Sequence, residues 1–217
     1  MRIDDNRVDV YLPAAVCLAV LAGMAGMQEG VASWLEYDRL AIAQGELWRL
    51  WSGHLVHFTA GQAAWDGLAL LVPALWLLGR GARSLVAGML LLMAPAVSLA
   101  LFLLVPDMAV YRGASALAVG LWVFALAEAW RAYPALRPAL WAAALVLCAK
   151  LAAEPFGGFA VADLPAGVAV AWQAHWAGVA FGALSVLAFR LAERGSSWLT
   201  SSAPRHQVLG NHRRSRA

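Results

Sequence analysis

Six apolar runs constrain the fold of this chain more than any other feature of its sequence. A helix needs about 20 residues to cross ~30 Å of hydrocarbon, so 217 residues suffice for six crossings with short loops and no sizeable soluble domain. With 62% hydrophobic and 13% charged residues, the composition also excludes an ordinary soluble domain. The sequence therefore predicts an all-α integral membrane protein with a bundle of six transmembrane helices. The predicted spans are residues 10–27, 61–79, 84–105, 114–130, 138–152 and 171–192.

The domain organisation is expected to be simple. A short N-terminal segment, 1–9, precedes one membrane domain, 10–192, and a basic tail, 193–217, follows it. The leader MRIDDNRVD carries three acids against two arginines, which favours an uncleaved first span over a secretory signal. The tail is polar and non-periodic, so we expect it to be disordered. The fifth run is short and ends near Lys150 and Glu154, which predicts a tilted or loosely packed helix.

The distribution of basic residues predicts the orientation in the membrane. Six spans place both termini on one side, and twelve of the sixteen Lys and Arg residues fall on that side. An excess of Lys and Arg marks the cytoplasmic side, so both termini should be cytoplasmic. The segments 28–60, 106–113 and 153–170 should then face outward. The first of them contains several tryptophans, whose rings suit the membrane interface: Trp34, Trp48 and Trp51.

Four polar residues inside the predicted spans are candidates for function, because such residues are costly in a membrane. Gln62 and Asp66 lie in the first turns of the second helix, one helical turn apart on the same face. Ser115 begins the fourth helix, and His175 lies one turn into the sixth. All three helices enter from the outer side, so the four residues should lie at a similar depth, within about 10 Å of the surface.

Ser115 and His175 together have the chemistry of a nucleophile and its base. A neutral imidazole within hydrogen-bonding distance is the commonest base for a serine. The Ser115 backbone N–H and the Gln62 amide could stabilise an oxyanion. An ionised Asp66 would repel that oxyanion, so Asp66 is either protonated or turned to orient a neighbour.

A packing role is the alternative for these residues. Ser115 lies between Gly113 and Gly120, and small residues allow membrane helices to approach closely. His175, in HWAGVAFG, could make a polar contact between helices beside a similar row of small residues. Their common depth favours catalysis, since packing alone gives them no reason to meet.

The remaining polar and special residues receive structural interpretations. His54 and His57 are expected to have a wet interfacial role just outside the second helix. Arg112 is expected to anchor a lipid headgroup or a loop. Pro73 and Pro95 are expected to kink the second and third helices.

The two cysteines, Cys17 and Cys148, lie in apolar runs and are interpreted as small buried hydrophobic residues. We expect no disulfide, no metal, no cofactor and no nucleic-acid partner.

Three segments resemble the rhomboid intramembrane serine proteases. ELWRLWSGHLVHFTAGQAAWD is similar to the rhomboid stretch that runs from the Trp-Arg motif of the first outer loop into the second helix. GASALAVG matches the G-x-S-x-x-x-x-G serine motif, and AHWAGVAFG matches the A-H-x-x-G-x-x-x-G histidine motif. The motif residues are Gly113, Ser115 and Gly120 in the first, and Ala174, His175, Gly178 and Gly182 in the second.

Departures from the common rhomboid pattern resemble the rhombosortase branch. Gln62 and Asp66 stand where rhomboids usually carry His and Asn, and Ala116 stands where a glycine commonly follows the serine. The resemblance implies a serine endopeptidase of the bacterial inner membrane with its site toward the periplasm. Its substrates would be membrane-anchored proteins with a C-terminal Gly-Gly sorting signal, an apolar helix and basic residues.

Two other classes of function remain open. A non-catalytic rhomboid-like protein would bind membrane clients without turnover. A small transporter would carry polar residues near the midplane and interrupted helices in two corresponding halves. For the peptidase, the fifth helix and the following loop, with Gly157 and Gly158, are the candidate gate.

Overall fold

The computed structural model describes residues 29–158 and 164–201, with side chains as far as Arg194. Five helices of this part of the chain are long and apolar enough to cross a membrane. They are α5 (Ala60–Gly79), α6 (Arg83–Leu104), α7 (Ser115–Ala132), α8 (Arg137–Ala153) and α9 (Trp172–Ser201). Single 3-10 turns flank α8, namely η1 (Pro134–Leu136) and η2 (Glu154–Phe156).

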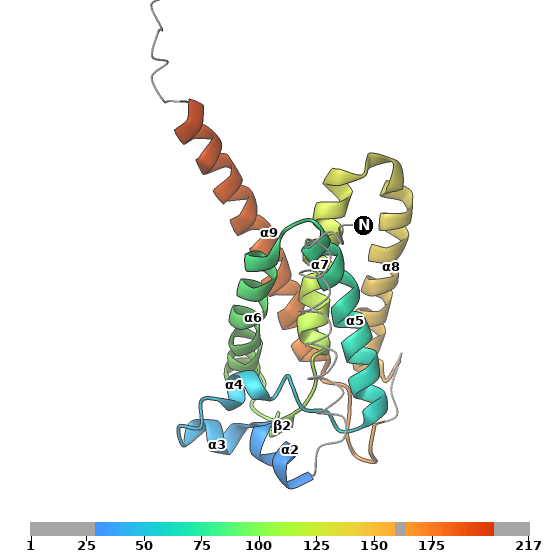
Figure 1. Ribbon diagram of the computed structural model, residues 1–217. Helices are drawn as coiled ribbons and strands as arrows, with labels where there is room; N and C mark the ends of the chain where they lie inside the picture. Colours follow the sequence, from blue (N-terminus) through green and yellow to red (C-terminus); the bar gives the residue numbers. More distant parts are fainter. Residues whose placement is uncertain (1–28, 159–163, 202–217) are drawn as a thin grey trace, which may run out of the picture. The chain divides into compact units, whose positions relative to one another are not determined.

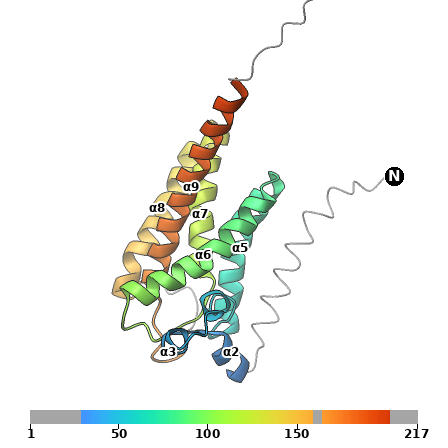
Figure 2. The ribbon, with the colours of Figure 1, turned by 90° about the vertical axis from the view of Figure 1, so that its left-hand side faces the viewer.

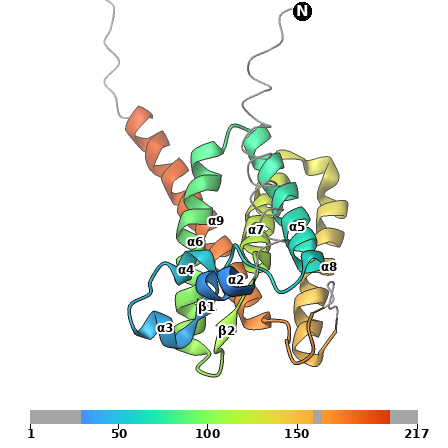
Figure 3. The same cartoon turned by 60° about the horizontal axis from the view of Figure 1, so that its bottom comes forward.

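Short elements fill the segment before α5. These are α2 (Glu29–Leu35), β1 (Tyr37–Asp38), α3 (Arg39–Ala43) and α4 (Arg49–Ser52). β1 pairs antiparallel with β2 (Val110–Tyr111), with Tyr37 opposite Tyr111. Figure 2 shows α2 and α3 at the end of the bundle where α5 begins, and Figure 3 shows β1 and β2 at the same end. The segment is therefore a folded cover over one end of the helices.

The predicted all-α membrane fold is confirmed by these helices. Each lies within a few residues of its predicted span, except that α9 continues to Ser201, beyond the predicted end at residue 192. The sequence offers a physical reason, since the next proline that would stop a helix is Pro204. The predicted first span, 10–27, and the end of the predicted tail lie outside the described residues.

The fifth predicted span, now α8, is loosely packed as expected. Leu151 is its only buried residue, and Cys148 is exposed. The interpretation of Cys148 as buried was therefore wrong, because little of the protein covers α8. Cys17 lies outside the described residues. Pro73 and Pro95 lie inside α5 and α6, and both helices continue through them.

Helix α7 is the central element of the bundle. It packs against α5, α6 and α8, and Figure 1 shows it between these three helices. Leu121 and Phe124 of α7 and Met93 of α6 have no solvent exposure. The described residues up to Val186 form one compact unit. A second unit begins at Leu187 and contains the rest of α9, where Arg190 and Glu193 lie 3.8 Å apart.

Glycines bring α7 and the first part of α9 into backbone contact. A Cβ placed on Gly178 would lie 2.2 Å from the carbonyl oxygen of Ala116, and one on Gly182 would lie 2.5 Å from that of Gly120. A Cβ on Gly120 would in turn lie 2.9 Å from the carbonyl oxygen of Gly178. Only small residues permit such an approach. The contact sets the first turns of α7 and α9 side by side.

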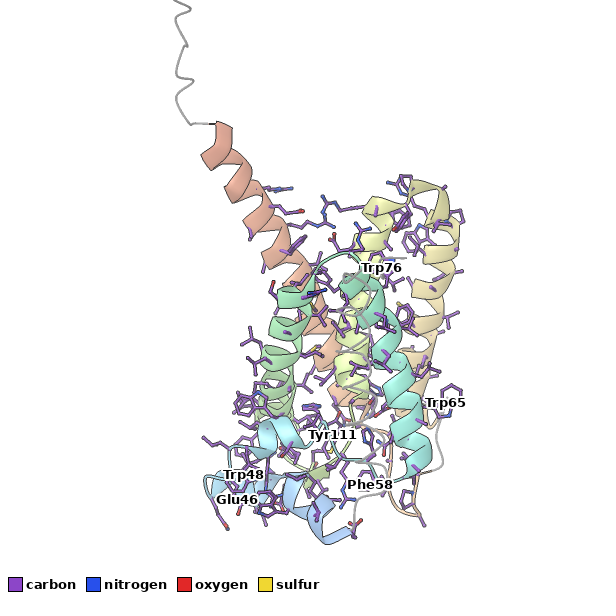
Figure 4. The ribbon with its side chains drawn as sticks, in the orientation of Figure 1. Glu46, Trp48, Phe58, Trp65, Trp76 and Tyr111 are labelled. Carbon is purple, nitrogen blue, oxygen red and sulfur yellow. The ribbon has the colours of Figure 1, made fainter. Side chains whose placement is uncertain are left out.

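A buried arginine holds the cover segment together. The Arg49 guanidinium donates to the carbonyl oxygens of Ser33 (2.8 Å) and Glu36 (2.9 Å) and to the carboxylate of Glu46 (2.7 Å). These bonds connect α4 to α2 and the turn after it. Trp48 of this segment is exposed and lies at the same end of the bundle as Phe58 and Tyr111 (Figure 4). The predicted interfacial position of the tryptophans stays a prediction.

Candidate active site

Four side chains form a continuous series of hydrogen bonds at this end of the bundle. Ser115 Oγ lies 2.8 Å from His175 Nε2. On the other side of the ring, His175 Nδ1 lies 2.6 Å from Glu154 Oε2. The second carboxylate oxygen of Glu154 accepts from the Lys150 ammonium group. The structure thus brings Ser115 and His175 into contact, as their common depth predicted. It adds Glu154 and Lys150, which were not predicted as site residues.

Three helix ends position these groups. Ser115 is the first residue of α7, and His175 is in the first turn of α9. Glu154 opens the η2 turn directly after α8. The approach of Gly178 to Ala116 holds α7 and α9 close enough for Ser115 and His175 to meet. The site therefore depends on one small-residue contact and on the end of the loosely packed α8.

The hydrogen-bonded chain lines a cavity of about 1370 Å³. Glu154 and His175 are buried, whereas Ser115 is partly accessible from the cavity. The residues that line the cavity include Trp65 on α5 and Trp122 on α7. The cavity is far larger than a water molecule needs, so an extended peptide segment could enter it and reach Ser115.

The start of α7 offers an unused hydrogen-bond donor. The first N–H groups of a helix have no partner within it. Ala114 at the N-cap of α7 supplies no side-chain cap. The backbone N–H of Ser115 is therefore a donor beside the hydroxyl that would attack, as an oxyanion requires.

Gln62 holds the loop before Ser115 and lines the same cavity. Its Oε1 accepts from the Phe58 N–H (2.9 Å), and its Nε2 donates to the Arg112 carbonyl (3.0 Å). A primary amide has two N–H donors, so one remains for a ligand oxygen. A Cβ on Gly113 would lie 2.7 Å from Gln62 Nε2, so the loop runs directly against this amide.

Asp66 orients the backbone before the nucleophile. Its Oδ2 accepts from the Ala114 N–H at 2.9 Å and lies 3.3 Å from His57 Nε2. The contact with Ala114 fits the second of the two roles considered for Asp66, which is to orient a neighbour. The His57 side chain has no solvent exposure, so the expected wet interfacial role of His57 was wrong.

His54 and Tyr111 support the same loop from the other side. The Tyr111 hydroxyl donates to the Gly113 carbonyl at 2.7 Å, and His54 Nδ1 lies 3.3 Å from that oxygen. His54 Nε2 lies 2.9 Å from the Ala94 carbonyl. His54 has no exposure, which also contradicts its expected wet role. The cause is the fold of the cover segment, which places α4 and the residues after it against α6.

Burial of His54 predicts a loss of stability in mild acid. Burial lowers the pKa of His54 from 6.5 to about 4, although the Ala94 and Gly113 carbonyls oppose the change. Between these pH values the unfolded chain binds a proton and the folded chain does not. The free energy of unfolding should therefore fall by about 3 kcal/mol as the pH falls from about 6.5 to about 4. Unfolding of wild type and His54→Gln in detergent, compared at several pH values, measures this loss, and parallel curves would contradict it.

Arg112 anchors a loop, which is one of its two predicted roles. Its guanidinium is buried, lies 2.7 Å from the Glu36 carboxylate and 2.5 Å from that of Glu29, and stacks over the Phe58 ring at 4.7 Å. Burial alone would lower the pKa of Arg112, but the hydrogen bonds to Glu29 and Glu36 raise it above its usual value. Because Arg112 pairs with the carboxylates of Glu29 and Glu36, the structure shows the loop anchor and not the lipid-headgroup anchor.

Glu154 is the main site residue that sequence reasoning missed. The sequence carried a signal, because Glu154 is an acid near the end of an apolar run, the same property that singled out Asp66. It was used only to infer the tilt or loose packing of the helix. Tyr111, in contrast, lies in a short strand outside the spans, where one tyrosine carries no comparable signal.

Comparison with protein-family models and with curated proteins gives no match to this chain. Among the described residues, no group of three or more His, Cys, Asp and Glu side chains could hold a metal ion. A functional assignment therefore depends on the geometry of the site and on the resemblance of the motifs.

Proposed function

We propose that this protein is an intramembrane serine endopeptidase, with Ser115 as the nucleophile and His175 as the general base. The observation that carries the proposal is the 2.8 Å contact between Ser115 Oγ and His175 Nε2 at a cavity wall. Within this class, the serine and histidine motifs support a rhomboid-type protease of the rhombosortase branch. A buried serine used only for packing would need neither the imidazole nor the cavity.

The reaction follows from these atoms. Ser115 Oγ attacks the carbonyl carbon of a peptide bond while His175 Nε2 accepts the hydroxyl proton. The oxyanion of the tetrahedral intermediate accepts from the Ser115 N–H and the second Gln62 N–H. His175 returns the proton to the leaving amine as the C–N bond breaks. Water, deprotonated by His175, then hydrolyses the acyl-enzyme and restores the Ser115 hydroxyl.

The membrane arrangement is part of the proposal. With residues 10–27 as a sixth span, both termini lie in the cytoplasm of a bacterium and the site lies near the periplasmic face of the inner membrane. The excess of Lys and Arg on one side supports this orientation. The exposed Trp34, Trp48 and Trp51 support an interfacial position for the cover segment.

The proposed substrates are membrane-anchored proteins with a C-terminal sorting signal, cleaved near its Gly-Gly pair. A hydrogen-bonded helix hides its carbonyl groups, so small residues that let the helix unwind favour attack. Entry requires an element that can move, and α8 is the best candidate because Leu151 is its only buried residue. Gly157, with φ of 77°, ends the η2 turn after this helix.

The alternatives fit the site less well. A client-binding protein without turnover needs no serine, histidine and glutamate in hydrogen-bonded order. A transporter needs polar groups near the middle of the helices, whereas Ser115, His175 and Glu154 all lie at helix ends.

Labelling with a fluorophosphonate probe, which reacts with activated serines, tests the proposal. Wild type in detergent should be labelled, whereas Ser115→Ala should not be, and His175→Ala should be labelled at least about 10²-fold more slowly because its general base is missing. The matched control is Ser33→Ala, since Ser33 lies exposed on α2 and its hydroxyl donates to the Gly30 carbonyl, away from the cavity. A membrane-impermeant form of the probe should label Ser115 in intact spheroplasts.

Three results would contradict the proposal. Labelling that persists in Ser115→Ala would show that Ser115 is not the nucleophile. An unlabelled wild type, with the chain folded, would favour the client-binding alternative. Labelling by the impermeant probe only after the spheroplasts are lysed would reverse the proposed orientation.

A further inference from the structure

We propose that Glu154 is a positioning residue that completes a Ser115–His175–Glu154 triad by fixing the tautomer and orientation of the His175 ring. The inference rests on the proposed function for its catalytic consequence. The sequence analysis predicted a dyad of Ser115 and His175 only.

The hydrogen-bond geometry defines which nitrogen of His175 carries the proton. A carboxylate oxygen is an acceptor, so the 2.6 Å contact between His175 Nδ1 and Glu154 Oε2 requires a proton on Nδ1. In a neutral imidazole this leaves Nε2 with a lone pair. That lone pair faces Ser115 Oγ at 2.8 Å, as a general base must. Without Glu154, the contact between Ser115 and His175 would not favour the productive tautomer, with the proton on Nδ1, over the tautomer with the proton on Nε2.

Burial and charge make the contact with Glu154 stronger than a surface pair. The Glu154 side chain has no solvent exposure, and that of His175 is 5% exposed. Both carboxylate oxygens of Glu154 have partners, one in His175 and the other in the Lys150 ammonium group. The carboxylate is therefore held in place before reaction and would stabilise the imidazolium that forms when Ser115 attacks.

The backbone around Glu154 is also defined. The Gly157 N–H donates to the Glu154 carbonyl at 3.0 Å, and the Gly158 N–H donates to the Ala153 carbonyl at 3.0 Å. Gly157 adopts a left-handed conformation that ends the η2 turn. Since α8 buries only Leu151, the bond from Glu154 to His175 is a main polar link between this helix and α9.

The first test is the rate of fluorophosphonate labelling in Glu154→Gln. The amide keeps the size of the side chain but can donate to Nδ1, which favours the wrong tautomer. We expect the labelling rate constant of the folded variant to fall by roughly 10²- to 10⁴-fold. Thermal unfolding is measured alongside, because the buried pairs with His175 and Lys150 also contribute to stability. Glu193→Gln, the same change in an exposed pair with Arg190, should keep the wild-type rate. An unchanged rate in Glu154→Gln would overturn the proposal.

The second test does not depend on activity. The ¹⁵N chemical shifts of labelled histidine report which ring nitrogen carries the proton, and His175→Gln identifies the His175 signals by their loss. Wild type should show His175 protonated at Nδ1, and Glu154→Gln should shift the population toward Nε2. A wild-type ring protonated at Nε2 would overturn the proposal. An unlabelled wild type with the Nδ1 tautomer would instead contradict the proposed function and leave the positioning role of Glu154 supported.

Discussion

Gly178→Ala is expected to destabilise the protein and to suppress labelling of Ser115 in one step. The new Cβ would lie 2.2 Å from the Ala116 carbonyl oxygen, a backbone atom that cannot rotate away. Helices α7 and α9 must then separate, and overpacking of this kind costs typically 1–3 kcal/mol. The same separation moves His175 away from Ser115. Because a misplacement of about 1 Å can cost roughly 10²-fold in rate, labelling should fall by at least that factor.

The matched control is Gly88→Ala in α6. A Cβ on Gly88 meets no atom within 4 Å, and alanine is a better helix former than glycine by about 1 kcal/mol. Gly88→Ala should therefore unfold at the wild-type temperature or above and keep its labelling rate. Thermal unfolding in detergent and labelling kinetics measure both effects. If the two variants behave alike, the close contact between α7 and α9 does not hold the site together.

Gly113→Ala is expected to slow labelling strongly by distorting the loop that precedes Ser115. Gly113 has φ of 134°, a conformation that residues with a side chain rarely adopt, and such strain costs of order 1–3 kcal/mol. Its new Cβ would lie 2.7 Å from Gln62 Nε2 and 2.9 Å from Asp66 Oδ2. Relief of these contacts displaces the amide proposed to bind the oxyanion. We expect at least a 10²-fold loss of labelling, as for removal of an oxyanion donor.

Gly45→Ala is the control that separates backbone strain from displacement of the active-site loop. Gly45 also has a positive φ, of 103°, but a Cβ there meets no atom within 4 Å. This variant should lose stability by a similar amount and keep the wild-type labelling rate. The comparison uses thermal unfolding and labelling of the two variants side by side. Equal loss of labelling in both would mean that Gly113 acts only through general stability.

The sequence predicted the pairing of Ser115 with His175 because membrane helices convert sequence position into depth. Each span crosses the same thickness, so residues near the outer end of alternate helices lie at one level whatever the packing. The depth of a residue does not determine the direction in which its side chain points around the helix axis. That is why Gln62 was predicted beside the oxyanion, while its bond to the Arg112 carbonyl was not.

The buried histidines show a second limit of the sequence. The segment before α5 contains several tryptophans, and its two histidines lie just outside the second predicted span, so the sequence predicts an interfacial segment with wet histidines. In the structure, Arg49 ties its short helices together and β1 pairs with β2 across more than 70 residues of chain. His54 and His57 become buried as a result. Such pairings depend on contacts between distant residues, which local composition does not encode.

By itself, the sequence determined the membrane class, five of the helices seen here, and the candidate nucleophile and base, because hydrophobic length and motif spacing are local properties. Only the tertiary structure shows that Glu154 lies beside His175 and that Asp66 binds the backbone at Ala114. Glu154 reaches His175 because α8 ends in a tight turn at the level of α9, and Asp66 binds Ala114 because α5 packs against the start of α7. Both contacts depend on the rotation of each helix about its axis and on the distance between helices. Side-chain packing throughout the bundle sets these two quantities.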